Sequence, residues 1–311
     1  MHRQRFAVLS LTCLLATASS SAQGAEGAIG TYGLGTSAFS AGVTPPPGTY
    51  VSTVASYYHA DIGGTVPFQG IILNAGLKID FFTSALAALY VPDRKVLGGN
   101  FGLSVTVPVG HVQFAANVGI GPLSASREVD GWGLGDIVPR MQLGWQNGDL
   151  AYTVWLQAVT PTGRYEKGFS PIIGLNRPGI DSGLAVTWTD KTWTKLQFNG
   201  AAGFTFNFEN QATDYKTGNE FHFEWAIGRE FGNGLILGVA GYDYRQLTGD
   251  SGAGAVVGPF KSRVDAIGPA LNYTTMVGKT PVIFDLRHYE EFNAKARFEG
   301  NQTIGSVTVR F

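Results

Sequence analysis

Apolar and polar side chains alternate one by one in segments of about ten residues through most of this chain. In the segment 220–231 one face carries large apolar side chains, and the other carries charged or small ones. The segments 192–207 and 136–146 repeat the pattern. Successive side chains of a β-strand point to opposite faces, so these segments predict amphipathic strands. Such strands build either a soluble sandwich with the bulky face inward or a membrane barrel with the bulky face toward lipid.

The lengths of the predicted connections distinguish these two folds. Long connections are expected at 292–301, 248–260, 208–219, 161–180 and 121–135, and short ones between them at 277–280, 232–234, 190–191 and 147–149. Outer-membrane barrels alternate long extracellular loops with short periplasmic turns, whereas a sandwich gives no reason for strict alternation. The pattern therefore predicts an all-β transmembrane antiparallel β-barrel of the outer membrane.

The strand count depends on the segment 100–119. If it is one long strand bent at Pro108 and Gly110, the alternation of connections is kept and the barrel has twelve strands. If it is a hairpin, and a further strand lies before Tyr50, the barrel has fourteen. We expect twelve.

The composition excludes several other classes of protein. Charged residues make up 14% of the chain and 43 residues are glycine, which is unlike an ordinary soluble enzyme. The net charge of −1 gives no basic surface for nucleic acid. After the N-terminus no apolar run reaches the length of about 20 residues that a membrane helix needs.

The N-terminal residues predict export. Arg3 and Arg5 precede an apolar stretch at 6–18, and small residues follow, which is typical of a secretory signal peptide. We expect the signal peptide to be residues 1–22, and the alternative is cleavage after residue 24. Cys13 lies in this segment and is the chain's one cysteine, so the mature protein has no disulfide and no thiol chemistry.

The segment 23–49 differs from the rest because prolines and glycines crowd it, including Pro45, Pro46 and Pro47. That composition disfavours a ladder strand. The segment is either a periplasmic tail or a plug in the lumen, and we expect the plug, since Tyr32 and Phe39 suit an interior. The barrel itself is expected to be residues 50–311.

Charged side chains on the predicted polar faces should line the lumen, because charge facing hydrocarbon is costly. These lumen-lining candidates are Asp136, Arg140, Lys195, Glu220, His222, Glu224, Asp243, Arg245, Asp285, Arg287 and Glu291. We expect acids and bases to pair across neighbouring strands, as Asp243 with Arg287 and Asp285 with Arg245. The alternative is that some of them bind or steer a permeant molecule.

Motifs for catalysis or cofactors are weak. The glycine-rich run 33–38 follows no predicted strand, and the run 249–252, which resembles a serine-protease nucleophile segment, falls in a predicted loop. His222 and Ser262 are the nearest pair for a lipid-modifying barrel enzyme. The histidines show no metal-ligand spacing. We therefore expect no enzyme activity, no metal and no cofactor.

The C-terminal strand alternates apolar residues and closes on Phe311, which resembles the assembly signal of bacterial outer-membrane proteins. Several further runs resemble the family named for the meta-pathway of phenol degradation. They are Pro45 to Tyr50, Gly131 to Asp136, Thr160 to Tyr165, Thr213 to Phe221, Tyr244 to Gly252, Gly268-Pro269 and Arg287 to Phe292. The resemblance covers nearly the whole mature chain. It implies an outer-membrane barrel tied to catabolism of aromatic compounds, similar in plan to plugged channels for hydrophobic compounds.

We therefore expect a monomeric barrel in the outer membrane of a Gram-negative cell, through which small hydrophobic or aromatic molecules diffuse. Twelve strands enclose a narrower lumen than porins of 16 to 18 strands, so lining groups and the plug would set selectivity. The expected partners are outer-membrane lipid, the solutes and the outer-membrane assembly machinery. The alternative is a barrel without transport that serves envelope structure or binds a partner through its loops.

Overall fold

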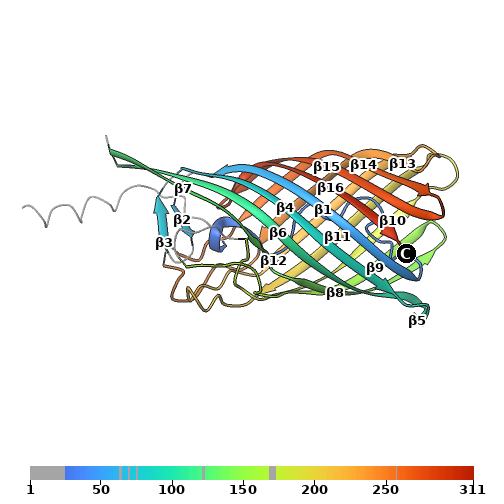
Figure 1. Ribbon diagram of the computed structural model, residues 1–311, viewed down its shortest axis with the longest axis horizontal. Helices are drawn as coiled ribbons and strands as arrows, with labels where there is room; N and C mark the ends of the chain where they lie inside the picture. Colours follow the sequence, from blue (N-terminus) through green and yellow to red (C-terminus); the bar gives the residue numbers. More distant parts are fainter. Residues whose placement is uncertain are drawn as a thin grey trace, which may run out of the picture.

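Twelve strands form a closed antiparallel barrel in the computed structural model, which describes residues 25–62, 65–68, 71–74, 76–120, 123–167, 173–256 and 258–311 (Figure 1). In order around the barrel they are β1 (Gly48–Ile62), β4 (Gly76–Val91), β6 (Gly99–Ile120), β8 (Val138–Asn147), β9 (Leu150–Val159), β10 (Gly179–Thr189), β11 (Leu196–Asn207), β12 (Glu220–Glu230), β13 (Leu235–Gln246), β14 (Arg263–Val277), β15 (Thr280–Lys295) and β16 (Glu299–Arg310). Pairing of β1 with β16, with Tyr50 opposite Arg310, closes the ring. The prediction of a twelve-stranded barrel is confirmed.

Strand β6 is the long continuous strand expected at 100–119. Its first part, Asn100–Thr106, pairs with β8, and its second part, Val109–Ile120, pairs with β7 (Leu123–Leu134). The expectation of a long loop at 121–135 is therefore wrong. Serine, charged residues and glycine dominate this stretch of sequence, so no apolar alternation marks the strand.

The expected long connection at 292–301 is also wrong, because β15 continues to Lys295 and β16 begins at Glu299.

Smaller elements complete the described structure. They are the 3₁₀ turn η1 (Glu26–Ala28), the hairpin of β2 (Thr65–Phe68) with β3 (Ile71–Asn74), and β5 (Lys95–Val96) at the start of β6. No helix within the described ranges is long and apolar enough to cross a membrane.

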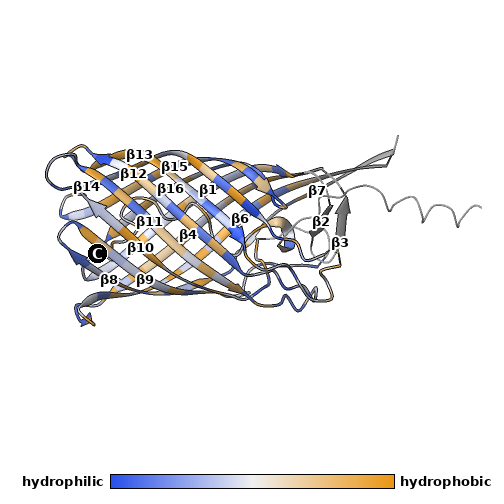
Figure 2. Cartoon of the chain, turned by 180° about the vertical axis from the view of Figure 1, so that it is seen from behind, coloured by the Kyte–Doolittle hydropathy of each residue, from blue (hydrophilic) through white to orange (hydrophobic). Residues whose placement is uncertain are grey.

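Large apolar side chains cover the outer face of the barrel. Leu184, Trp188 and Phe206 are 45%, 43% and 50% exposed, and all three alternate with buried neighbours on the same strands. Figure 2 shows hydrophobic residues interspersed with polar ones along the strands of the wall that face the viewer. A soluble protein rarely exposes so continuous an apolar surface, so this face is suited to lipid.

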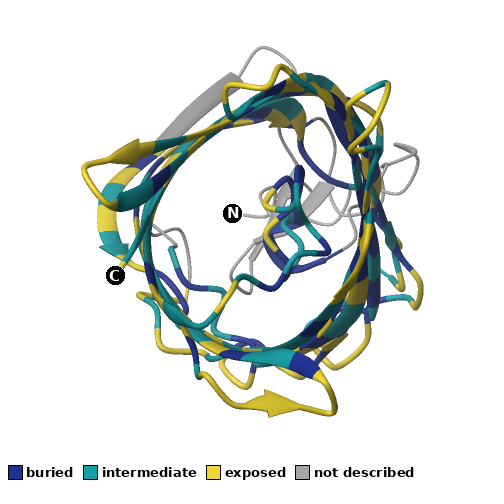
Figure 3. Ribbon diagram, turned by 90° about the vertical axis from the view of Figure 1, so that its right-hand side faces the viewer, coloured by how far each residue is buried: buried dark blue, intermediate teal, exposed yellow. Residues whose placement is uncertain are grey.

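Residues 25–47, here called the plug segment, lie inside the barrel (Figure 3). The segment starts near the long connections at one end and leaves the lumen at Gly48, beside Phe311 at the other end. Its apolar residues Tyr32, Leu34 and Phe39 pack against the inner faces of β12 to β16 in one buried cluster. The main core of the molecule is thus the contact between the plug segment and one side of the wall.

Candidate functional site

The plug segment has almost no regular secondary structure, so wall side chains satisfy its backbone hydrogen bonds. Near the end with the long connections, the Thr31 amide donates to Glu220 Oε2 (3.1 Å), and the Thr31 hydroxyl donates to Asn207 Oδ1 (2.7 Å). Arg177 reaches in from the β9–β10 connection and donates to the carbonyl oxygens of Glu26 (3.1 Å) and Ile29 (2.6 Å). These contacts hold the first turn of the plug segment against three parts of the wall.

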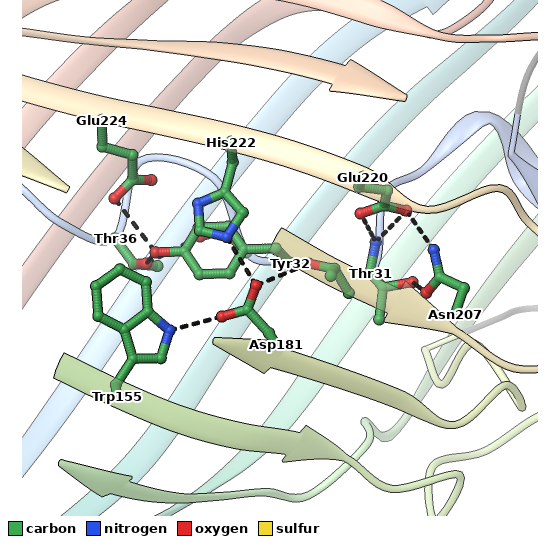
Figure 4. A network of polar contacts seen from close by, with 11 residues as sticks. Thr31, Tyr32, Thr36, Trp155, Asp181, Asn207, Glu220, His222 and Glu224 are labelled. Carbon is green, nitrogen blue, oxygen red and sulfur yellow. Dashed lines mark hydrogen bonds and ion pairs between the residues drawn. The ribbon is translucent and has the colours of Figure 1, made fainter. Parts of the chain in front are cut away.

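Glu224, on the lumen face of β12, binds the middle of the plug segment. Its Oε1 accepts the Gly35 amide at 2.5 Å, and its Oε2 accepts the Ser37 amide at 2.6 Å. The same Oε2 accepts the Tyr32 hydroxyl at 3.4 Å (Figure 4). A carboxylate that accepts several N–H donors is a strong, charge-assisted acceptor. The Glu224 carboxylate therefore holds the turn at Gly35 to Ser37 of the plug segment in place.

His222 lies two residues earlier on the same face and connects the plug segment to the opposite part of the wall. Its ring stacks on Tyr32 with centroids 3.5 Å apart, and its Nε2 lies 2.8 Å from Asp181 Oδ2. Asp181 also accepts the Trp155 indole N–H (2.7 Å) and the Thr205 hydroxyl (2.8 Å). Figure 4 shows these side chains converging from β9, β10 and β12 on the ring of Tyr32.

Two glycines leave room for this cluster. A Cβ on Gly203 would lie 2.5 Å from His222 Cε1, and one on Gly183 would lie 2.4 Å from Trp155 Cζ2. Gly183 and Gly203 are partners in the β10–β11 ladder, so together they form a flat patch of wall under the two rings. Arg140 lies over Trp155 at 5.0 Å from the ring centroid, which adds a cation–π contact to the same cluster.

A cavity of about 370 Å³ lies between residues 36–41 of the plug segment and the wall of β1 and β14 to β16. Arg287 is one of the lining residues and donates from Nη1 to the carbonyl oxygens of Gly35 (2.9 Å) and Thr36 (2.8 Å). The lining combines apolar groups with hydroxyl, amide and charged groups. Among these residues are Phe39, Val54, Ile283, Ile304, Asn272, Asp285, Ser306 and Thr308.

Hydrogen bonds between neutral groups hold residues 40–44 of the plug segment against the wall. The Ser40 amide donates to Gln197 Oε1 (3.0 Å), and the Gly42 amide donates to Thr187 Oγ1 (2.9 Å). The hydroxyls of Thr44 and Thr153 lie 2.9 Å apart. At the exit, Arg310 on β16 donates to the carbonyl oxygen of Pro47 (2.7 Å), so both ends of the segment are fastened.

Of the predicted lumen candidates, Arg140, Glu220, His222, Glu224, Asp285, Arg287 and Glu291 lie on the inner face. Glu291 accepts the hydroxyls of Tyr58 (2.7 Å) and Tyr242 (2.8 Å), so it joins β1 and β13 across the lumen. Asp136 is buried at the junction of β7 and β8, where it accepts the amides of Gly163 and Leu175. It fastens the β9–β10 connection rather than facing the plug segment.

Three candidates lie elsewhere. Lys195 is exposed in the short turn between β10 and β11, where it donates to the Lys191 carbonyl. Asp243 and Arg245 face outward, because the buried Tyr242 and Tyr244 occupy the lumen face of β13. Our assignment reversed these two faces, since it placed every bulky residue toward lipid.

The expected pairs of Asp243 with Arg287 and of Asp285 with Arg245 do not form, because β14 separates β13 from β15. Arg245 instead pairs on the outer face with Asp243 (2.5 Å) and Asp265 (2.7 Å). These charged residues lie near the strand ends that lead into the long connections. A charge that faces lipid there, away from the middle of the bilayer, destabilises a barrel only slightly.

His222 and Ser262, the pair considered for catalysis, have separate partners. His222 binds Asp181, whereas the Ser262 hydroxyl donates to Gln246 Oε1 (3.0 Å). Within the part of the chain that the structure describes, no group of three histidine, cysteine or acidic residues is placed to hold a metal ion. Sequence reasoning missed Asp181, Trp155, Arg177 and Tyr58, whose roles depend on partners more than twenty residues away.

A closed twelve-stranded barrel with an apolar exterior and a lumen filled by its own N-terminal segment defines a plugged outer-membrane β-barrel. Within that class, the chain belongs to the family described as "Putative MetA-pathway of phenol degradation", whose model matches residues 48–305. No curated protein matches the chain.

A solved outer-membrane structure shares the fold, and others are less similar. The COG4313 outer membrane channel from Pseudomonas putida F1 is 12% identical, with a TM-score of 0.67 over 86% of this chain and 97% of that one. The transport unit of the autotransporter AIDA-I from Escherichia coli is 9% identical, with a TM-score of 0.48 over 85% of this chain and 90% of that one. A FadL homologue from Pseudomonas aeruginosa is 7% identical, with a TM-score of 0.42 over 85% of this chain and 90% of that one.

Proposed function

We propose that this protein is an outer-membrane channel through which small hydrophobic or aromatic compounds diffuse into the periplasm of a Gram-negative cell. The observation that carries the proposal is the cavity beneath the plug segment, inside a wall that faces lipid. The family description points to aromatic catabolism, and a matching solved structure is named as an outer membrane channel.

The size of the cavity suits one aromatic ring. An apolar cavity of about 150 Å³ is enough to bind benzene in an engineered protein, so 370 Å³ leaves room for a substituted ring. Its two kinds of lining suit an amphipathic solute. The ring would pack on Phe39, Ile283 and Ile304, and a hydroxyl would reach Asp285 or Asn272.

The first experiment measures entry of labelled phenol-like, long-chain and sugar solutes into liposomes that contain the refolded protein, beside empty liposomes of the same lipid. We expect saturable entry of the aromatic solute. Equal entry of sugars and phenols would contradict selectivity for hydrophobic compounds, and entry no faster than through bare lipid would contradict transport.

A disulfide between plug and wall tests whether transport requires the plug segment to move. The hydroxyls of Thr44 and Thr153 are 2.9 Å apart, and the mature chain expected here lacks cysteine, so the variant Thr44→Cys/Thr153→Cys offers one defined bond. The control is His288→Cys/Thr303→Cys, which joins β15 to β16 away from the cavity, where His288 Nδ1 and the Thr303 hydroxyl are 2.8 Å apart. We expect oxidation to slow transport in the first variant and reduction to restore it.

The second candidate function is a barrel that serves envelope structure or binds a partner without transport. The observation that favours it is the number of wall groups that hold the plug segment along its whole length. If it is correct, deleting residues 25–47 should leave solute entry in cells unchanged but weaken the envelope against detergent.

A further inference from the structure

The start of the plug segment lies in a buried site made by the connections at the extracellular end. Ala25 is 1% exposed, and its backbone nitrogen donates to Asp250 Oδ2 at 2.9 Å. Asp250 belongs to the β13–β14 connection, so this bond joins residues 225 positions apart. The site therefore receives the backbone nitrogen of Ala25.

The carboxylate of Asp250 lacks a counter-ion. It is 4% exposed, and its other donors are the Tyr215 hydroxyl (2.6 Å), the Gly218 amide (3.0 Å) and the Gln246 amide group (2.6 Å), which are all neutral. Among the described residues, no lysine, arginine or histidine forms an ion pair with it. Burial raises the pKa of Asp250, because a carboxylate is costly in such a site without a positive charge.

The backbone at Ala25 gives a second, independent observation. Its φ is +60° with ψ of 140°, a conformation that residues with a Cβ rarely adopt. The torsion φ is defined by the carbonyl carbon of the preceding residue. A chain that begins at Ala25 has no such carbonyl, so the steric strain disappears while the nitrogen keeps its place.

The sequence before Ala25 permits cleavage at this position. Ala22 and Gly24 put small residues three positions and one position before the bond, which is the pattern of a signal-peptide cleavage site. Hydrolysis of the Gly24–Ala25 bond adds water: the carboxylate leaves with Gly24, and Ala25 keeps a free amine. An α-amino group has a pKa of about 7.7 to 8.0 when unperturbed, so it is protonated at neutral pH.

We propose that the signal peptide is removed after Gly24 and that the α-ammonium of Ala25 is the counter-ion of Asp250. Processing thus creates the charged group that fastens the extracellular end of the plug segment. The capture of a chain terminus in a polar site is a known mode of recognition, used here within one chain. The inference is independent of the solute that the channel carries.

Intact-mass measurement and N-terminal sequencing of protein purified from outer membranes test the cleavage position directly. We expect the mature chain to begin at Ala25. A mature chain that begins at Gln23, or at any other residue, would overturn the proposal.

The ion pair needs its own test, for which Asp250→Asn is compared with Asp214→Asn, an exposed aspartate of a neighbouring connection. The measurement is the rate at which an amine-selective reagent labels the terminus of the folded barrel near neutral pH. We expect labelling to be at least about tenfold faster in Asp250→Asn, because loss of a buried partner lets the terminus detach, and unchanged in Asp214→Asn. Equal rates in Asp250→Asn and the natural sequence would overturn the ion pair.

The ion pair can also be tested in the natural sequence, so that the test does not depend on the folding of a variant. The pKa of the Ala25 ammonium can be followed by NMR after isotope labelling of alanine. An ammonium paired with a buried carboxylate should titrate above its usual range of about 7.7 to 8.0. A pKa within or below that range would contradict the pairing.

Discussion

The imidazole of His222 lies flat on the ring of Tyr32, with centroids 3.5 Å apart and an angle of 12° between the planes. One ring belongs to the wall and the other to the plug segment. Asp181, on β10 of the wall, orients the imidazole through a hydrogen bond of 2.8 Å between its Oδ2 and His222 Nε2. The plug is therefore positioned at its middle by a stacked pair whose wall member is held in place independently of the plug.

Tyr32→Ala should detach the middle of the plug segment, whereas Tyr32→Phe should not. Truncating a buried aromatic side chain costs about 3 to 5 kcal/mol, while the phenylalanine variant keeps the stack and loses the two 3.4 Å contacts of the hydroxyl with Glu224 and Thr36. We expect a higher single-channel conductance and a lower midpoint of thermal unfolding for the alanine variant. Equal conductance of the two variants would mean that the stack does not hold the plug.

Glu224→Gln should loosen the turn at Gly35 to Ser37. The carboxylate accepts two backbone amides, and an amide side chain would offer one weaker acceptor and turn an N–H toward the other donor. Loss of a hydrogen bond to a charged group costs about 1.5 to 3 kcal/mol. Faster hydrogen exchange at Gly35 and Ser37 checks this expectation. Glu230→Gln, at the end of the same strand, should leave these amides protected.

Filling the cavity should weaken the binding of aromatic solutes without unfolding the barrel. Ser306→Phe puts a ring into the cavity, and Ser182→Phe puts the same ring on the outer face, between Ile180 and Leu184. We expect affinity for a phenol-like ligand, measured by calorimetry in detergent, to fall at least about tenfold in the first variant only. A similar loss in both variants would contradict a solute site at the cavity.

Acid should leave Asp190 ionised well below the usual range for aspartate. This turn carboxylate accepts backbone and hydroxyl donors from Thr192 and Thr194, which lower its pKa. A depressed pKa stabilises the fold above the unfolded value of about 3.9, and that stabilisation is lost as pH falls through the folded pKa. NMR of the carboxyl carbon should show no titration between about pH 6 and 3. A midpoint near 3.9 would disprove the turn's effect.

Alternation in the sequence predicted the barrel well because each strand must separate lipid from lumen. The same rule placed His222 and Glu224 on the lumen face, but it failed at β13. There Tyr242 and Tyr244 face inward, since their hydroxyls have partners in Glu291 and Ser262, and the charges face outward. Alternation gives the two faces of a strand, but the partners available inside decide which face is the lumen.

The contacts of the plug segment could not be predicted from periodicity, because it has none. Arg177 reaches Thr31 across 146 positions, and Glu224 reaches Gly35 across 189. Glycines at 183 and 203 were a usable signal, since small residues on a lumen face leave space for large ones such as Trp155. However, the space beside Gly183 and Gly203 lies opposite Tyr32 only because the barrel closes around the plug segment.

The pairing of β1 with β16 turns the lumen into a tunnel that is open only at its two ends. The plug segment runs from one end to the other and is fastened at both, by Asp250 near its start and by Arg310 near its finish. Because each end of the segment is fastened separately, release of one end would leave the segment tethered in the lumen by the other.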